Sequence, residues 1–205
     1  MAKETAHQIG TPLTSLLGWN ELLKKQSLNP QITAEIEKDI GRLQTITERF
    51  SQIGSTPKLE TSDIVAETKS AFEYLRARSS KLVHFTFNSK VDALPVLLNK
   101  ALYHWTIENL VKNGIDAMKG KGEISIEILP SSQYVHILVA DTGHGIPRKQ
   151  FQEIFTPGYT TKKRGWGLGL SLVKRIVEEY HTGKIKVLSS GKDGTVMQLS
   201  LRMDQ

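Results

Sequence analysis

Two asparagines four positions apart are the first residues whose types and spacing suggest chemistry. Asn109 and Asn113 belong to the segment 108–113, ENLVKN, within a run of helix-favouring residues. Residues four apart on a helix project from the same face. Two amide oxygens presented together suit a hard cation such as Mg²⁺, which prefers oxygen ligands and keeps water or phosphate oxygens at its other positions. An exposed or capping pair of asparagines is the alternative, and the pair alone does not exclude it.

A carboxylate followed by two glycines comes directly after a strand-like run. Segment 141–147 is DTGHGIP, which contains Asp141, Gly143 and Gly145. The carboxylate can accept a hydrogen bond from an exocyclic amine, and the glycines let the backbone approach a flat ring closely. A tight turn that begins with an aspartate is the alternative interpretation.

A second glycine-rich segment, GWGLGL at residues 165–170, opens a predicted helix. Glycines at a helix N-terminus expose N–H groups and the positive end of the helix dipole to phosphate. The same segment alone could mark only a hinge. Lys162, Lys163 and Arg164 precede it, and they are candidates for offsetting phosphate charge or, equally, a solvated basic loop.

Apolar periodicity predicts the elements that must position these residues. A mixed sheet with helices on one face is expected, and residues 147–165 are expected to form a long irregular lid or loop. Ser62 is the expected N-cap of the first helix of this part. The predicted helices are 62–78, 97–118 and 168–180, and the predicted strands are 82–87, 123–129, 134–140, 184–188 and 195–201.

The residues before position 57 have a different pattern. Two helical stretches flank Ser27–Pro30, with apolar seams that include Ile9, Leu13 and Leu16, and turn residues interrupt the pattern at 54–57. The sequence therefore predicts an antiparallel helical hairpin over 1–57 and an α/β domain over 58–205. A hairpin of this size buries too little apolar surface to stand alone, so we expect two chains to form a four-helix bundle as a homodimer.

The composition excludes several classes of site. The 205 residues include 27 Lys and Arg against 21 Asp and Glu, a formal charge of +6, and no cysteine. Disulfide scaffolds, Cys-ligated zinc, iron–sulfur clusters and cysteine nucleophiles are therefore excluded. Basic residues are scattered without interleaved aromatic side chains, so no nucleic-acid partner is expected. No apolar run reaches the roughly 20 residues of a membrane span, so we expect no membrane contact from this sequence and a cytoplasmic setting.

In their order and spacing, these segments resemble the ATP-binding domain of sensor histidine kinases. That domain shares its fold with DNA gyrase, mismatch-repair ATPases and the ninety-kilodalton heat-shock chaperones. The resemblance covers residues 61–205 almost continuously. The matching motifs are the N box at Asn109 and Asn113, the G1 box at 141–147, the F box at Phe151 and Phe155, the G2 box at 165–170 and the last glycine motif at Gly194-Thr195.

The resemblance implies an α/β sandwich that binds ATP and Mg²⁺. It implies that Asp141 recognises the adenine amino group, that Asn109 and Asn113 serve the metal and phosphates, and that 147–165 is the ATP lid. Trp166 stands where the family more often has Thr or Ser. The full set of expected nucleotide-binding residues is Asn109, Lys112, Asn113, Asp141, Gly143, Gly145, Ile146, Lys162, Gly165, Gly167, Leu168, Gly169, Leu170 and Thr195.

A further segment, AHQIGTPL at 6–13, resembles the H box of the dimerisation and histidine-phosphotransfer domain. The resemblance implies that His7 receives the γ-phosphoryl group. Gln8 replaces the family's usual acidic residue, and an amide can orient an imidazole but cannot act as a base. Thr11 matches a position that orients water during dephosphorylation of the response-regulator partner.

The sequence is therefore predicted to be an α+β, homodimeric histidine protein kinase core. His7 would be phosphorylated from ATP and would pass the phosphoryl group to an Asp of a response regulator, with phosphatase activity toward the regulator as a second expectation. An upstream sensor, either membrane-bound or soluble, is expected in the parent protein, so this sequence could be the cytoplasmic portion of a membrane-bound sensor. Two alternatives stay open: a pseudokinase scaffold, suggested by Gln8, Gly10 and Trp166, and an ATP-hydrolysing conformational switch of the gyrase kind.

Overall fold

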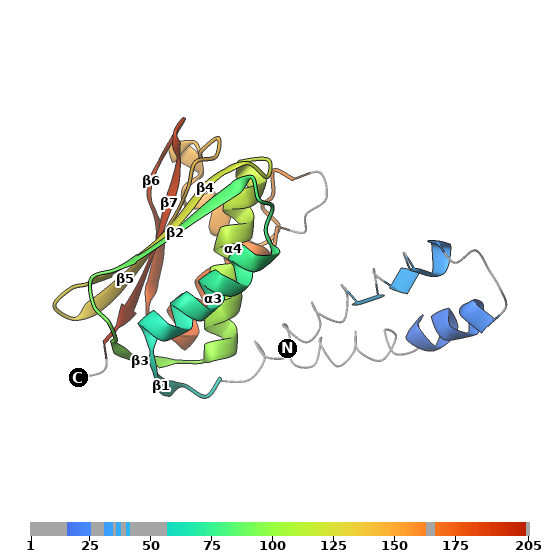
Figure 1. Cartoon of the computed structure of the whole chain (residues 1–205), viewed down its shortest axis with the longest axis horizontal. Coiled ribbons are helices and arrows are strands. Elements are labelled where there is room, and N and C mark those ends of the chain that lie inside the picture. The colour runs from blue at the N-terminus through green and yellow to red at the C-terminus, as the bar shows by residue number, and fades with distance from the viewer. Residues whose placement is uncertain are drawn as a thin grey trace. The chain divides into compact units, whose positions relative to one another are not determined.

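The computed structural model describes residues 16–25, 31–34, 36–37, 40–41, 57–162 and 167–203 (Figure 1). The chain divides into two compact units, Met1–Pro57 and Lys58–Gln205. Among the described residues, no helix is both long and apolar enough to cross a membrane. The predicted α+β fold is confirmed.

The described part of the first unit is helical. Asn20 and Ile40 are buried there, whereas Leu16, Trp19 and Leu22 are 47%, 62% and 49% exposed. Leu16, which the sequence assigns to an apolar seam, is therefore not buried within the single chain. These three apolar residues recur every third position and form a stripe that the chain itself leaves open to solvent, as a helix in a larger bundle would. The helical residues are 16–25, 31–34, 36–37 and 40–41.

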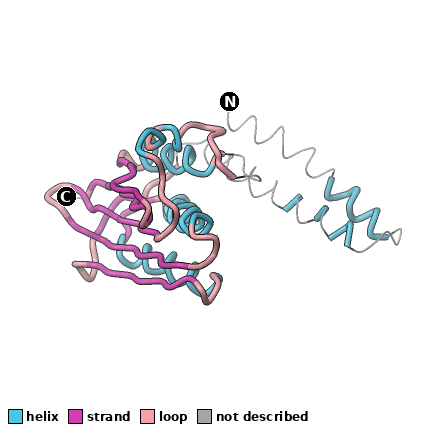
Figure 2. The backbone as a smooth tube through the Cα atoms, turned by 90° about the horizontal axis from the view of Figure 1, so that it is seen from above, coloured by secondary structure: helices cyan, strands magenta, loops and turns pink. Residues whose placement is uncertain are grey.

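A five-stranded mixed sheet forms one layer of the second unit (Figures 1 and 2). The strand order is β2-β4-β5-β7-β6, in which β2 and β4 are parallel and the other neighbours are antiparallel. The strands are β2 (Val83–Ser89), β4 (Gly122–Pro130), β5 (Tyr134–Asp141), β6 (Lys184–Gly191) and β7 (Gly194–Arg202).

The helices of this unit pack on one face of the sheet (Figure 1). Along β4 and β5 every second residue is buried, which turns Ile126 and Ile137 toward the helices. Ile107 and Val111 of the central helix are fully buried in the same core. The helices are α3 (Ile64–Arg78), α4 (Lys100–Ala117) and α5 (Gly169–Arg175), which continues into the π-helical turn η3 (Ile176–Tyr180).

A small second sheet, which the sequence did not predict, shortens two predicted helices. Strands β1 (Glu60–Asp63) and β3 (Pro95–Leu98) pair antiparallel. Asp63, not Ser62, caps α3, because its carboxylate accepts from Val65 N at 3.0 Å. Asn99 caps α4 by accepting from Leu102 N at 3.1 Å. The helices predicted to begin at 62 and 97 therefore begin at 64 and 100.

The segment predicted as an irregular lid contains two short 3₁₀ helices, η1 (Arg148–Gln150) and η2 (Glu153–Phe155). Ile154 and Phe155 of η2 are buried against the core. The early part of the predicted lid is thus packed structure, because its apolar side chains find partners in the domain.

Candidate functional site

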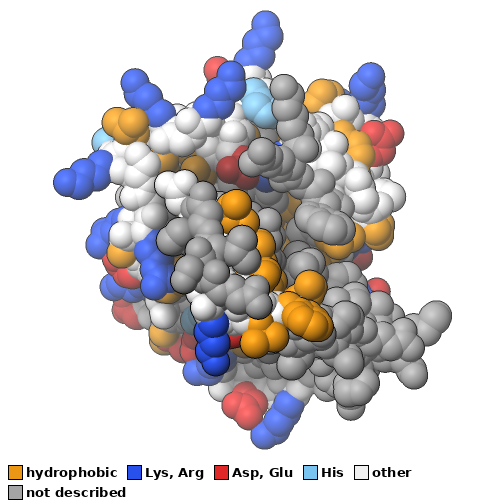
Figure 3. All heavy atoms as spheres, turned by 90° about the vertical axis from the view of Figure 1, so that its right-hand side faces the viewer, with side chains coloured by type: hydrophobic (Ala, Val, Ile, Leu, Met, Phe, Trp, Pro, Cys, Tyr) orange, Lys and Arg blue, Asp and Glu red, His pale blue; other side chains and the backbone are white. Residues whose placement is uncertain are grey.

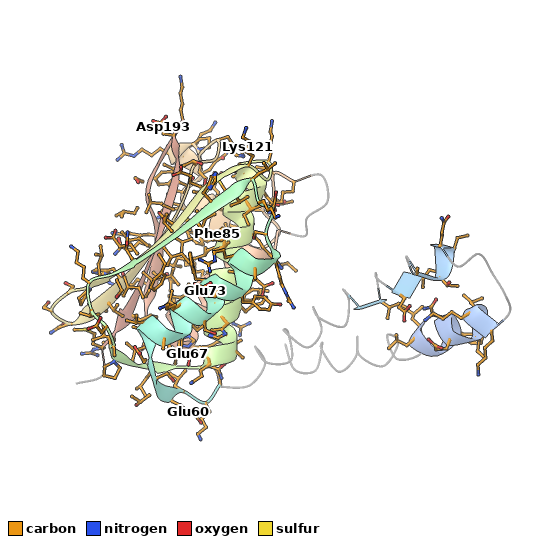
Figure 4. The ribbon with its side chains drawn as sticks, viewed as in Figure 1. Glu60, Glu67, Glu73, Phe85, Lys121 and Asp193 are labelled. Carbon is orange, nitrogen blue, oxygen red and sulfur yellow. The ribbon has the colours of Figure 1, made fainter. Side chains whose placement is uncertain are left out.

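The candidate site lies at one end of the sheet, where α4 and β5 both end. Lys121, just after α4, and Asp193, between β6 and β7, lie at this end, and Glu60 lies at the other (Figure 4). The β5–β7 pairing places Asp141 opposite Thr195. Residues predicted from two separate motifs, the G1 box and the last glycine motif, therefore meet at one end of the domain.

Asp141 ends β5 with a half-buried carboxylate. Its Oδ1 accepts a hydrogen bond from Gly143 N at 2.8 Å. Burial raises the pKa of the Asp141 carboxyl above its ordinary value, while the N–H groups of Gly143 and Thr195 and the nearby His144 partly oppose the rise. A carboxylate held by backbone donors in a partly dry site is suited to accept from an amine of a bound ring.

A glycine of α4 makes room for this carboxylate. A Cβ on Gly114 would lie 2.8 Å from the Asp141 Cβ and 3.3 Å from its Oδ2. Glycine inside a helix costs about 1 kcal/mol relative to alanine. The cost at Gly114 has a structural reason, because the helix backbone and Asp141 approach too closely for any larger residue.

The loop after Asp141 is fixed against the β6–β7 hairpin. Gly145 has φ +75°, and a Cβ there would collide with the carbonyl oxygen of Gly191. Ile146 N donates to Ser190 Oγ at 2.7 Å, and Ser190 Oγ lies 2.8 Å from the buried Thr195 Oγ1. These contacts fix the backbone conformation of the predicted G1 segment, residues 141–147.

The amide of Asn109 has a defined orientation. Its Nδ2 donates to Trp105 O at 3.0 Å. A Cβ on Gly169, the first residue of α5, would lie 2.8 Å from Asn109 Oδ1. The amide oxygen therefore faces the start of α5, where only glycine leaves it space.

Asn113 presents its amide oxygen to a cation. The Lys162 ammonium donates to Asn113 Oδ1 at 2.8 Å and to Asp116 Oδ2 at 2.6 Å. Lys112, in contrast, is exposed and pairs with Glu108 one turn earlier on α4. Of these two lysines, Lys162 and not Lys112 contacts the amide oxygen of Asn113.

A backbone contact between Gly158 and Gly167 joins the two ends of the segment that precedes α5, and we call this contact the neck. Gly158 N donates to Gly167 O at 3.0 Å, and Gly167 has φ +65°. A Cβ on Gly167 would overlap the backbone of Gly158 and Tyr159. Lys174 of α5 lies over the ring of Phe155 at 5.8 Å, which ties α5 to η2.

The arrangement fits a ligand that combines a flat, amine-bearing ring with a polyphosphate and a divalent cation. Asp141 offers the acceptor for an amine. Asn113 Oδ1 accepts from the Lys162 ammonium, and Asn109 Oδ1 faces Gly169, which has no side chain. Both amide oxygens therefore suit a hard cation whose other ligands are phosphate and water oxygens. The site residues thus fit both ATP and Mg²⁺.

Charge outside this site is dispersed. In Figure 3, the described Lys and Arg side chains project from separate places around one face of the molecule, with Asp and Glu between them. The scattered basic residues of the sequence are scattered on this face too.

The contacts above link Asp141, Gly143, Ile146 and Thr195 through the β5–β7 pairing and Ser190, and they place Asn109 against Gly169 and Asn113 against Lys162. Leu170 packs against the core, and Leu168 begins the turn into α5, where its carbonyl accepts from Ser171 Oγ. Some predicted site residues lie outside the described residues: His7, Gln8 and Thr11, the lid residues Lys163, Arg164 and Gly165, and Trp166, which directly follows the lid.

Sequence reasoning missed Gly114, Asp116 and Ser190. Gly114 could have been found, because a glycine inside a helix signals a close approach. Asp116 lies three residues after Asn113, so helical spacing places the two on one face. Ser190 carries no signal, since its role depends on the pairing of β6 with β7.

Two family matches cover most of the chain. Residues 99–205 match the family described as "Histidine kinase-, DNA gyrase B-, and HSP90-like ATPase". Residues 1–56 match the "His Kinase A (phospho-acceptor) domain".

The curated relatives are sensor and sporulation kinases. Sporulation kinase D of Bacillus subtilis is 30% identical over 209 residues, which covers 98% of this chain and 41% of the relative. An NtrY-like sensor histidine kinase from Rickettsia bellii is 27% identical over 217 residues, covering 100% of this chain and 35% of the relative. The chain thus spans about a third to a half of the curated relatives it matches.

Solved structures share the fold. The nucleotide-free catalytic domain of histidine kinase ThkA has a TM-score of 0.66 at 26% identity, covering 71% of this chain and 96% of that chain. ThkA in complex with response regulator protein TrrA has a TM-score of 0.69 at 24% identity, covering 98% and 60%.

Proposed function

The chain belongs to the family of histidine kinase-, DNA gyrase B- and HSP90-like ATPases, and on this premise we propose that it is the kinase core of a two-component signalling protein in the cytoplasm. His7 takes the γ-phosphoryl group of ATP, and an Asp of a response regulator then takes it from His7. Residues 1–57 serve as the dimerisation and phosphoacceptor unit, and residues 58–205 serve as the ATP-binding unit.

One observation carries the proposal: a half-buried carboxylate and two asparagine side chains one helical turn apart lie at one end of the domain. Asp141 ends β5, while Asn109 and Asn113 lie one turn apart on α4 and so share a face of that helix. Gly114 and Gly169 leave these groups the space that side chains would fill. Together with the phospho-acceptor match over residues 1–56, this supports phosphoryl transfer to histidine.

Each residue of the site has a proposed task. Asp141 accepts from the adenine amino group, Gly143 and Gly145 let the backbone approach the ring, and Asn109 and Asn113 hold the metal and phosphate end. Bound ATP with Mg²⁺ supplies the phosphoryl group and neutralises charge in a loose transition state. The main contribution of the protein is then alignment.

His7 is the proposed nucleophile. A neutral imidazole, with an ordinary pKa of about 6.5, has a free nitrogen lone pair at neutral pH. The new N–P bond forms as the bond from the γ-phosphorus to the bridging oxygen breaks, ADP leaves, and the imidazole N–H proton passes to solvent. Gln8 can accept that N–H and orient the ring, although it cannot act as a base. Thr11 is the proposed water-orienting residue in dephosphorylation of the regulator.

The decisive experiment is incubation of the full chain with γ-labelled ATP and Mg²⁺. The chain is expected to acquire a label that is labile in acid and stable in base, as a phosphoramidate is, and His7→Ala is expected to lose it. Nucleotide binding should persist in His7→Ala, which controls for folding of the ATP-binding unit.

The same experiment separates the alternatives. Nucleotide binding without any protein label would indicate a pseudokinase scaffold. Steady release of labelled phosphate without a phosphorylated chain, unchanged in His7→Ala, would indicate an ATP-hydrolysing switch.

A further inference from the structure

A carboxylate outside the sequence motifs anchors the lysine that contacts Asn113. The Lys162 ammonium lies 2.6 Å from Asp116 Oδ2 and 2.8 Å from Asn113 Oδ1. Asn113 and Asp116 are three residues apart on α4, so their side chains lie on neighbouring positions of one face. Two oxygens of α4 therefore share one ammonium.

We propose that Asp116 is a positioning residue that holds the Lys162 ammonium on Asn113 Oδ1, where the ammonium competes with the divalent cation for that oxygen. Lys162, Asn113 and Asp116 together are called the Lys162 latch. The inference rests on the nucleotide-binding function proposed above. It adds that the Lys162 latch raises the Mg²⁺ concentration needed for nucleotide binding.

The competition follows from the chemistry of the shared oxygen. A primary ammonium and a hard divalent cation both seek oxygen ligands. Two cations on one amide oxygen would lie a few ångströms apart and repel each other. Binding of the metal to Asn113 Oδ1 therefore requires Lys162 to leave it.

Asp116 supplies the charge that makes this contact persist. A neutral amide oxygen alone holds an exposed, well-hydrated lysine weakly, and the carboxylate adds the attraction between opposite charges. The Lys162 and Asp116 side chains are 43% and 56% exposed, so water and salt screen the pair. The latch is thus a modest bias that a metal–nucleotide complex overcomes.

The first test compares the wild-type full chain with Asp116→Asn, which keeps the shape of the side chain and removes its charge. Binding of a fluorescent ATP analogue is titrated with Mg²⁺ after removal of bound metal. The variant is expected to reach half-maximal binding at about two- to fivefold less Mg²⁺, the effect of losing one exposed ion pair. The difference should shrink in about 0.5 M salt, where an exposed pair is screened.

A coupled variant and a matched control sharpen the comparison. In a Lys162→Met background, Asp116→Asn is expected to change the Mg²⁺ requirement no further, because the latch is already absent. Glu73→Gln is the control, since Glu73 is also an exposed helix carboxylate, paired with Arg76 three residues on, and lies on α3 (Figure 4). Its Mg²⁺ requirement should equal that of the wild type.

A readout without metal or nucleotide tests the latch directly. In the metal-free chain, the ¹⁵N-labelled Lys162 ammonium should exchange its protons with water faster in Asp116→Asn than in the wild type. An unchanged or higher Mg²⁺ requirement, or an effect that persists in Lys162→Met, would overturn the latch while nucleotide binding stands. Failure of the wild-type chain to bind nucleotide would overturn both the latch and the proposed function.

Discussion

At the level of single residues, the absence of a Cβ at two glycines lets Asn109 and Asp141 adopt the orientations seen at the end of this domain. Asn109 is held by its bond to Trp105 O, and Gly169 lies against its free oxygen. Asp141 is held by Gly143 in space that Gly114 leaves open. Burial that raises the pKa of Asp141 also makes its ionised form a cost to folding, which falls away as the pH drops below the folded pKa.

Gly169→Ala should separate binding from stability. The added Cβ would lie 2.8 Å from Asn109 Oδ1, so the amide must leave the orientation that its Nδ2 bond sets. We expect affinity for ATP with Mg²⁺ to fall about tenfold, the loss of roughly one good hydrogen bond to a charged ligand. The free energy of unfolding should change by less than about 1 kcal/mol, because the helix preference of alanine over glycine, about 1 kcal/mol, offsets the cost of displacing the amide.

Nucleotide titration and urea unfolding measure the two quantities. Gly18→Ala is the matched control, since Gly18 is also helical and a Cβ there meets nothing within 4 Å. Equal affinity in Gly169→Ala and the wild type would contradict the role given to Asn109.

At the level of secondary-structure elements, His181 connects two helices. Its Nε2 accepts from Asn99 N at 3.0 Å, at the cap of α4, and its Nδ1 donates to Ile176 O at 2.8 Å, at the start of η3. Because a backbone N–H can only donate, the ring is neutral in this arrangement. Burial lowers the pKa of His181, and the bond to the Ile176 carbonyl partly opposes it.

Stability should therefore fall in mildly acidic solution. The folded pKa of His181 lies below the unfolded value of about 6.5, so the unfolded chain binds more protons between the two values. The stabilisation is present above the unfolded pKa and is lost as the pH falls through the folded pKa. Urea unfolding at pH 8 and pH 5.5 measures the loss.

His181→Gln removes the titrating ring and tests the assignment. The variant should lose about 1–3 kcal/mol at pH 8 from imperfectly replaced hydrogen bonds. Its stability should then depend less on pH in this range than that of the wild type. An equal pH dependence in both proteins would exclude His181 as the cause.

The elements also show how far local sequence signals reach. Period-two alternation predicted β4 and β5, because each has a buried and a more open face. Strands β1 and β3 were missed, since four-residue strands are defined by their mutual pairing. The ends of α3 and α4 moved by two to three residues because the caps Asp63 and Asn99 were not recognised.

Across the whole molecule, the candidate binding residues of the second unit could be proposed from the sequence because they sit in short motifs with fixed spacing, and their roles stay predictions. Gly114, Asp116 and Ser190 were not proposed, because their roles arise from contacts between distant segments. The phosphoacceptor residues His7, Gln8 and Thr11 remain predictions.

The first unit is expected to associate as a homodimer. Leu16, Trp19 and Leu22 form an open apolar stripe on its first helix, and such stripes favour association between helices. Trp19→Glu should weaken self-association at least tenfold by placing a charge in the stripe. Sedimentation of both proteins at micromolar concentration measures this, and a monomeric wild type would exclude the dimer.

The neck at Gly158 and Gly167 has a consequence for how this domain can diversify. Its backbone bond holds Gly158 and Gly167 next to each other, so any sequence between them begins and ends at nearly one point. The entropic cost of a closed loop grows only with the logarithm of its length. Beyond Tyr159, which packs against the core, longer or different sequences between Gly158 and Gly167 should thus cost the domain little stability.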